Sequence, residues 1–230
     1  MADLIEGHIY RTFDLELREL KEALLVEGAM VEQAMHSAIN ALLERKTELA
    51  QKVIDDDDMI NAKEVEIDEF CLKLLALRQP AARDLRFITT AIKINYDLER
   101  MGDHAVNIAE RVLELNTEPR LKPYIDLPLM AGIVQEMVKE SLEAFVKEDV
   151  ELALKITRDD EKVDQLLDQI FRELLTYMME DLKTITRATR LLFISKNLER
   201  IADHAVNISE LVIFMVKGKI IRHMKNPFER

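Results

Sequence analysis

A stretch of fifteen residues occurs twice in this chain, and it constrains the fold more than any other feature. Residues 98–112 read LERMGDHAVNIAERV and residues 198–212 read LERIADHAVNISELV, so eleven of the fifteen positions are identical at a spacing of 100. A shared helical composition would match Leu, Ala and Val, but it would not keep Glu-Arg, Asp-His and Asn in register. The sequence therefore predicts an internal duplication, with the repeated motif as the main functional candidate.

The composition favours an all-α protein with long helices. The 230 residues include only five Gly and five Pro, no Trp, and 33% charged residues. Few helix breakers and apolar residues that recur every three and four positions are typical of amphipathic helices. Six helices are predicted, at residues 10–45, from 47 or 55 to 77, and at 81–115, 130–147, 149–179 and 186–216.

One linker divides the duplicated halves. Pro119, Pro123 and Pro128 lie close together near the middle of the chain, and proline interrupts helices. Three helices on each side of this linker predict two tandem, internally duplicated three-helix bundles. The predicted division is a first bundle at 1–116, a linker at 117–128, a second bundle at 129–218 and a basic tail at 219–230. Gly218 is a plausible helix C-cap.

The repeat extends beyond the motif, with a change of spacing. Leu49-Ala50 matches Leu152-Ala153 at a spacing of 103 positions, against 100 for the motif. The first half therefore has three extra residues between its second and third helices. The turn around Gln79-Pro80 is their expected place.

Charge and cysteine content exclude several classes of protein. A net charge of −12 argues against nucleic-acid binding, which needs a basic face. Cys71 is the only cysteine, so an intrachain disulfide and a cysteine zinc cage are excluded, and its apolar position indicates a buried, inert thiol. Residues 1–7 do not resemble a signal peptide, and the apolar run 211–216 is far shorter than the ~20 residues of a membrane span. A cytoplasmic protein without a transmembrane segment is expected.

The repeated motif places two carboxylates side by side. On a helix, Leu98, Met101 and Ala105 belong to the core stripe, whereas Glu99 and Asp103 share another face as an i, i+4 pair. Such a pair repels by a few tenths of a kcal/mol. Its retention in both copies suggests use, and the chemistry that needs adjacent carboxylates is the binding of hard cations.

Further oxygen ligands accompany this pair. Glu199 and Asp203 repeat it in the second half. The additional candidate ligands, which carry less weight, are Asn107, Asn207, Glu64, Asp68, Asp164 and Asp168. The pairs Glu64/Asp68 and Asp164/Asp168 are separated by 100 positions and not by the 103 that aligns their helices, so they need not be equivalent.

Simpler interpretations stay open. The acids of a strongly acidic protein can be a solvated face, and Arg100 and Arg200 can pair with acids of neighbouring helices. For His104 and His204, a hydrogen bond at the bundle surface is favoured over metal ligation or phosphotransfer. No Glu-x-x-His pair, glycine-rich phosphate loop or Gly-x-Ser-x-Gly elbow accompanies the motif, so no catalytic residues are assigned.

At the level of motifs, the chain resembles the PhoU family of regulators associated with bacterial phosphate uptake. The segments DLERMGDHAVNIAE and NLERIADHAVNISE resemble the family signature, while residues 74–88 (LLALRQPAARDLRFI) and 175–181 (LTYMMED) are similar to its turns after the second helix. The resemblance implies a PhoU- or spectrin-like fold of two three-helix bundles. It also implies that the Glu/Asp-x-x-x-Asp pattern holds Fe, Zn, Mn or Mg ions on the bundle surface.

The same resemblance implies a role by protein contact. Family members connect the ATP-driven phosphate importer to a sensor histidine kinase, keep the phosphate-starvation response off when phosphate is plentiful, and restrain uptake. They are often homodimers. A carboxylate-bridged metalloenzyme and a plain helical scaffold are the alternatives from other functional classes.

Overall fold

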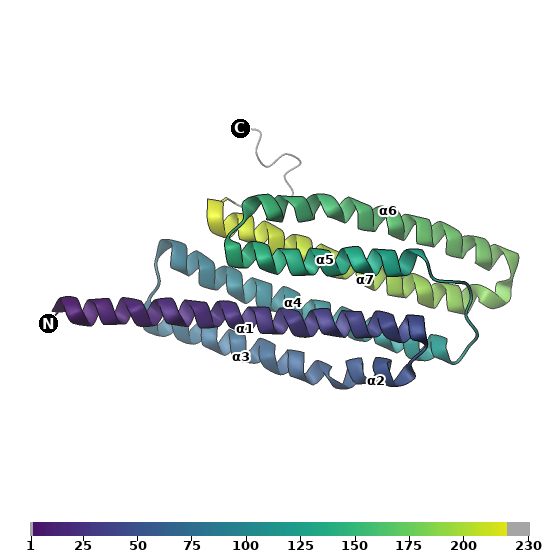
Figure 1. The fold of residues 1–230 in the computed structure, drawn as a ribbon, viewed down its shortest axis with the longest axis horizontal. Helices are drawn as coiled ribbons and strands as arrows, with labels where there is room; N and C mark the ends of the chain where they lie inside the picture. The colour runs from purple at the N-terminus through teal and green to yellow at the C-terminus, as the bar shows by residue number, and fades with distance from the viewer. Residues whose placement is uncertain (1, 220–230) are drawn as a thin grey trace.

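The chain folds into two three-helix bundles that lie side by side along one long axis (Figure 1). The computed structural model describes residues 2–219, with side chains from residue 12 onward. The first bundle consists of α1 (Ala2–Glu44), α2 (Thr47–Asp55), α3 (Asp57–Arg78) and α4 (Ala82–Asn116). The second consists of α5 (Asp126–Lys147), α6 (Val150–Glu180), the 3₁₀ helix η1 (Leu182–Thr184) and α7 (Ile185–Lys217). The predicted all-α, duplicated fold is confirmed.

Two predicted helix limits were wrong, and one predicted helix is divided in two. Helix α1 begins at Ala2 and not near residue 10. The second helix of the first bundle is interrupted at Asp56, which separates α2 from α3. Helix α5 begins at Asp126, so the last three residues of the predicted linker are helical. Pro128 is tolerated there because the first-turn N–H groups of a helix have no intrahelical acceptor.

The three extra residues of the first half lie where the spacing predicts. Ile60 and Val163, both buried, align at 103 positions, whereas the buried Ile94 and Ile194 align at 100. Between these pairs, α3 ends at Arg78 and is followed by Gln79, whose φ of 47° is left-handed. Gly218, with φ 68°, ends α7 as its C-cap, as predicted. The predicted basic tail lies outside the described residues from 220 onward.

The repeated motif supplies the centre of the core. Helices α4 and α7 pack against each other between the two bundles (Figure 1). Their stripes are fully buried at Leu98, Met101 and Ala105 and at the equivalent positions of α7. Apolar burial stabilises by roughly 25 cal/mol per Å², so this seam fixes the rotation of both helices. The rotation in turn decides where the polar side of each motif points.

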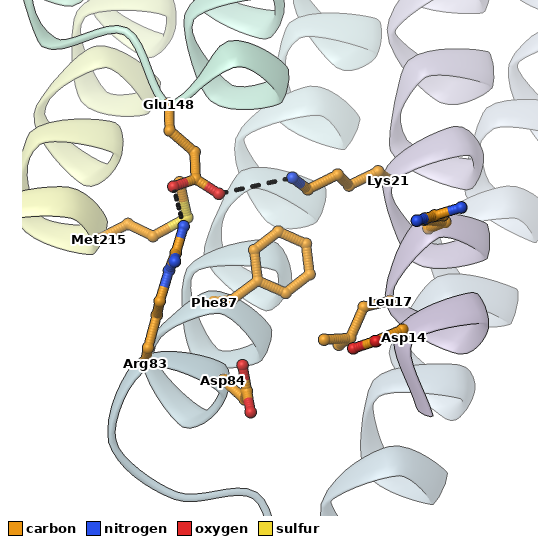
Figure 2. A pocket seen from close by; sticks show the side chains of 9 residues that line it. Asp14, Leu17, Lys21, Arg83, Asp84, Phe87, Glu148 and Met215 are labelled. Atoms are coloured by element: carbon orange, nitrogen blue, oxygen red, sulfur yellow. Dashed lines mark hydrogen bonds and ion pairs between the residues drawn. The ribbon is translucent and has the colours of Figure 1, made fainter. Parts of the chain in front are cut away.

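A pocket of about 250 Å³ lies where the bundles meet at the start of α4 (Figure 2). Glu148, in the turn between α5 and α6, contacts Lys21 of α1 at 3.6 Å and Arg83 of α4 at 2.5 Å. Below this bridge Phe87 stacks on Phe145 of the second bundle, with ring centroids 5.4 Å apart. These contacts tie the two bundles together.

Within residues 2–219, no helix combines the length and the apolar character that crossing a bilayer requires.

Candidate functional site

The acid pair of the first bundle lies on α4 and is partly buried. Glu99 and Asp103 are one helical turn apart, as the spacing predicts. Burial raises the pKa of Glu99, and the neighbouring Asp103 raises it further. Arg100 Nη1 donates to Asp103 Oδ2 at 2.5 Å, so this arginine pairs within its own helix and not with a neighbouring one.

A third carboxylate, Asp57, faces this pair from the start of α3. Burial raises the pKa of Asp57, and Asp103 contributes through its charge. Asn61 Nδ2 donates to Asp57 Oδ2 at 3.0 Å, whereas Asp57 Oδ1 is buried without any hydrogen-bond partner. The close approach of α3 to α4 depends on Gly102, because a Cβ there would lie 3.3 Å from Ile60.

The second bundle repeats this arrangement. Glu199 and Asp203 of α7 face Asp160 of α6, the residue equivalent to Asp57 at the spacing of 103. Burial first, and then the charges of Asp164, Asp203 and Glu199, together raise the pKa of Asp160 to about 6. Asp160 Oδ1 and Glu199 Oε2 are buried without hydrogen-bond partners. Lys196 donates to the other oxygen of Glu199 at 2.5 Å.

The additional acid pairs predicted from sequence are not equivalent. Asp164 belongs to the second cluster, but the side chain of Asp168 is 75% exposed and lies 3.8 Å from Arg172. In the first bundle, Asp68 Oδ1 accepts from Asn95 at 3.1 Å, and the pKa of Glu64 is raised by burial and by Asp68. The structure therefore separates Asp168 from the other candidates.

The histidines of the motif bond across the junction of the two bundles. His104 Nδ1 is 2.9 Å from Asn197 Oδ1, and His204 Nδ1 is 2.7 Å from Asp97 Oδ1, so each histidine bonds to the opposite bundle. Their rings are 5.6 Å apart. The hydrogen-bonding role predicted for the histidines agrees with this geometry.

Neither candidate asparagine hydrogen-bonds to the acid pair of its own helix. Asn207 Nδ2 is 3.4 Å from Asp97 Oδ1, at the junction of the two bundles, and Asn107 is exposed. By position, Asn107 and Asn207 lie one helical turn beyond Asp103 and Asp203, at the border of the acid pairs.

Each cluster has the donor chemistry of a hard-cation site. Within residues 2–219, no His, Cys, Asp and Glu side chains form, as they stand, a group of three or more that could hold a metal ion. The clusters nevertheless contain buried carboxylate oxygens that accept no hydrogen bond, and such atoms are costly unless a cation or donor meets them. Carboxylate oxygens suit Mg²⁺, Mn²⁺ and other hard cations, so the residues fit the implied metal.

The sequence interpretation missed Asp57 and Asp160. Asp57 lies in a run of four acids, Asp55 to Asp58, and the helix dipole favours acids at a helix start in any case, so this run does not by itself indicate a site. The available signal was the spacing of 103 positions between Asp57 and Asp160, the same spacing that aligns the second helices of the two halves.

Fold and site together define a class: an all-helical repeat protein of two three-helix bundles, each with a partly buried carboxylate cluster. The PhoU domain family matches residues 24–112 and 127–212, one match in each bundle. The chain belongs to the PhoU family.

Relatives match over nearly the whole chain. The phosphate-specific transport system accessory protein PhoU homolog of Pseudomonas aeruginosa is 43% identical over 96% of this chain and 92% of its own. The phosphate-specific transport system accessory protein PhoU of Escherichia coli K12 is 38% identical over 96% of this chain and 91% of its own.

Two solved structures share the fold. The crystal structure of PhoU from Pseudomonas aeruginosa superimposes with a TM-score of 0.86 at 43% identity, covering 90% of this chain and all of that one. The crystal structure of the phosphate transport system regulatory protein PhoU from Streptococcus pneumoniae superimposes with a TM-score of 0.84 at 33% identity. This match covers 90% of this chain and 98% of that one. The names of these relatives describe accessory and regulatory proteins of phosphate transport.

Proposed function

We propose that this protein is a cytoplasmic adaptor that negatively regulates phosphate import and the phosphate-starvation response. It contacts the ATPase subunit of the ATP-driven phosphate importer and a sensor histidine kinase, and it acts by protein contact without catalysis. The names of its relatives, which describe accessory and regulatory proteins, support this role.

The proposal includes metal binding at both acid clusters. One cluster consists of Asp57, Glu99 and Asp103, and the other of Asp160, Asp164, Glu199 and Asp203. The observation that carries it is the matched pair of buried, unpartnered oxygens, Asp57 Oδ1 and Asp160 Oδ1, each facing an i, i+4 acid pair. Oxygen ligands favour Mg²⁺ or Mn²⁺, with Fe and Zn as further candidates. A bound cation would offset the repulsion of the carboxylates and change the charge that the bundle presents to a partner.

Elemental analysis tests the metal sites. We compare the wild-type protein with a variant carrying Glu99→Gln, Asp103→Asn, Glu199→Gln and Asp203→Asn. Stoichiometric metal in the wild type and its loss from the variant are expected. If neither protein holds metal after reconstitution, the clusters are partner-facing or solvated acids and the metal sites are wrong.

Pull-down of the importer ATPase and the sensor kinase tests the adaptor role. Both are expected to bind the wild-type protein, and chelation is expected to weaken the interaction. If chelation leaves the binding of both partners unchanged, partner binding does not depend on the metal and that part of the proposal is wrong.

The same proposal includes a homodimer, which sedimentation analysis can check. The side chains of Phe171 on α6 and Phe193 on α7, 47% and 55% exposed beside an apolar pocket of about 330 Å³, support a surface for protein contact.

A further inference from the structure

A groove crosses the surface of the first bundle between α1 and the pair formed by α2 and α3. Helix α1 contacts both of them (Figure 1). The groove has a volume of about 530 Å³, and its walls lie between residues 26 and 37 of α1 and between residues 49 and 60 of α2 and α3. Its lining is mainly apolar and includes Val26 and Met59, which are 52% and 54% exposed. A rimmed apolar surface of this kind is typical of a site for protein contact.

The shape of the groove suits a helix. The stretch of α1 from Val26 to Ser37 spans about three turns, or about 16 Å at a rise of 1.5 Å per residue. Small side chains line this wall at Ala29, Ala34 and Ser37, and they leave room for the side chains of a partner. Gln33 Nε2 donates to Ser37 Oγ at 2.9 Å, so these two polar groups bond to each other within the wall. An amphipathic helix with apolar side chains at i, i+3 or i+4 and i+7 fills a groove of this length.

The second bundle carries ion pairs at the equivalent place. Lys155 Nζ lies 2.5 Å from Glu140 and 3.7 Å from Asp159. Lys162 Nζ lies 2.6 Å from the same Asp159. These contacts join α5 to α6 and cover the surface between them with charged groups.

The first bundle replaces two of these charged residues. Ser37 stands at the position of Glu140, and Met59 stands at the position of Lys162, both at the spacing of 103. The ion pairs made by Glu140 and Lys162 therefore have no counterpart, and the apolar lining is exposed instead. The same fold covers this surface with ion pairs in one bundle and leaves it apolar in the other, so the groove is a feature of the first bundle and not of the repeat.

The charges around the groove favour a basic partner. Asp55, Asp56 and Asp58 stand at the junction of α2 and α3, and Glu22 is exposed on α1 just before the groove. Lys52 is the one cation among the lining residues, and Asp56 lies in the same wall. A second copy of this chain, with a net charge of −12, would bring acids against acids. Basic residues beside an apolar stripe complement the groove, because like charges at an interface are costly and opposite charges are favourable.

We propose that this groove docks an amphipathic helix of a partner protein, with the apolar stripe of that helix in the groove and its basic residues against the acids at the α2–α3 junction. The inference rests on the proposed adaptor role for the identity of the partners, and it gives that role a contact surface. It does not depend on metal at the acid clusters.

A defined peptide tests the groove. The probe is a fluorescent synthetic peptide of about five helical turns, with leucine at i, i+3, i+4 and i+7 and lysine elsewhere, and its counterpart carries glutamate in place of lysine. Fluorescence anisotropy measures the binding of both peptides to the wild-type protein and to two double variants. The groove variant, Ser37→Glu with Met59→Lys, gives the first bundle the residues of the second and leaves the net charge unchanged.

The matched control changes the apolar pocket on α6 and α7. Phe171→Asp with Phe193→Lys gives the second bundle the residues that the first carries at Asp68 and Lys93, again without a change of net charge. Both variants are expected to fold, because each one uses residues that the other bundle already accommodates. The lysine peptide should bind the wild type and the control alike, and it should bind the groove variant at least about tenfold more weakly, as the loss of one apolar anchor implies.

Three results would overturn the groove. The first is no binding of the lysine peptide to the wild type, or equal binding to the groove variant. The second is a loss of binding in the control alone, which places the peptide on α6 and α7. The third is binding of the glutamate peptide as tightly as the lysine peptide, which excludes a basic partner. A wild-type dimer that becomes a monomer in the groove variant by sedimentation would assign the groove to a second copy and would also overturn the proposal.

Pull-down with the same variants separates the groove from the adaptor role. If the importer ATPase and the sensor kinase bind the wild type and the groove variant equally, the adaptor role stands and the groove is overturned as its surface. If neither protein binds the wild type, while the lysine peptide binds it and not the groove variant, the adaptor role fails and the helix-docking groove is supported.

Discussion

Replacing Glu27 with methionine should stabilise the metal-free protein at neutral pH. The carboxyl group is fully buried without a partner, and its folded-state pKa of about 9 stands far above the ordinary value of 4.5. Below pH 4.5 the group is protonated in both the folded and the unfolded states, and it contributes no pH dependence. As the pH rises from 4.5 to about 9, the unfolded state loses the proton and the folded state keeps it, so the free energy of unfolding falls.

The size of this effect follows from the pKa difference. Each pH unit in this window costs about 1.4 kcal/mol, so about 2.5 units between the ordinary value and pH 7 correspond to ~3 kcal/mol. Glu27→Met removes this cost. Its stability gain over the wild type should therefore grow by about 3 kcal/mol between pH 4.5 and pH 7.

Urea denaturation in excess chelator, followed by circular dichroism at several pH values, measures the difference. The extra apolar burial of methionine is the same at every pH, so the pH-dependent part isolates the carboxyl group. The charged neighbours of Glu27, which are Glu64, Asp68, Glu99 and Lys63, are present in both proteins. A gain that is the same at pH 5 and pH 7 would refute the reasoning.

Three further outcomes are expected. In chelator at pH 7, Asp160→Asn should stabilise the protein by about 1 kcal/mol, which is less than the raised pKa of about 6 implies because solvent screens this partly exposed group. Urea titration should show this gain vanish as the pH falls below the ordinary pKa of 3.8, where both the folded and the unfolded states are protonated. Gly28→Ala should lower the melting temperature, because the new Cβ would lie 2.1 Å from Leu142 Cδ1 and this overlap would cost about 1–3 kcal/mol of stability. As a control, Gly132→Ala should stabilise the protein by ~0.5–1 kcal/mol, because no atom lies within 4 Å of its Cβ and alanine favours the helix. Cys71 is fully buried, and its pKa is raised to about 12, first by burial and then by the charge of Asp68. The thiol should therefore resist a thiol reagent until the protein unfolds, and prompt labelling of the native protein would contradict this.

The sequence alone determined the helices, the duplication and the third-helix acid pairs. These features are local or repetitive: the apolar stripe through Leu98 and Met101 has the period of a helix, and the i, i+4 placement of Glu99 and Asp103 follows from that period. The change of spacing also located the extra residues beside Gln79. A helical pattern identifies which residues share a face without reference to any other helix.

Only the tertiary structure decided which faces meet. The rotation of α3 and α6 against their neighbours brings Asp57 and Asp160 to the acid pairs and leaves Asp168 exposed. The burial of Glu27 likewise depends on how α1 packs between α3 and α4, since its position on the helix is the same whether it lies in a core or in solvent. Contacts between helices depend on packing between residues that are far apart in the sequence. The periodicity of one helix does not determine how its partner helix is rotated against it.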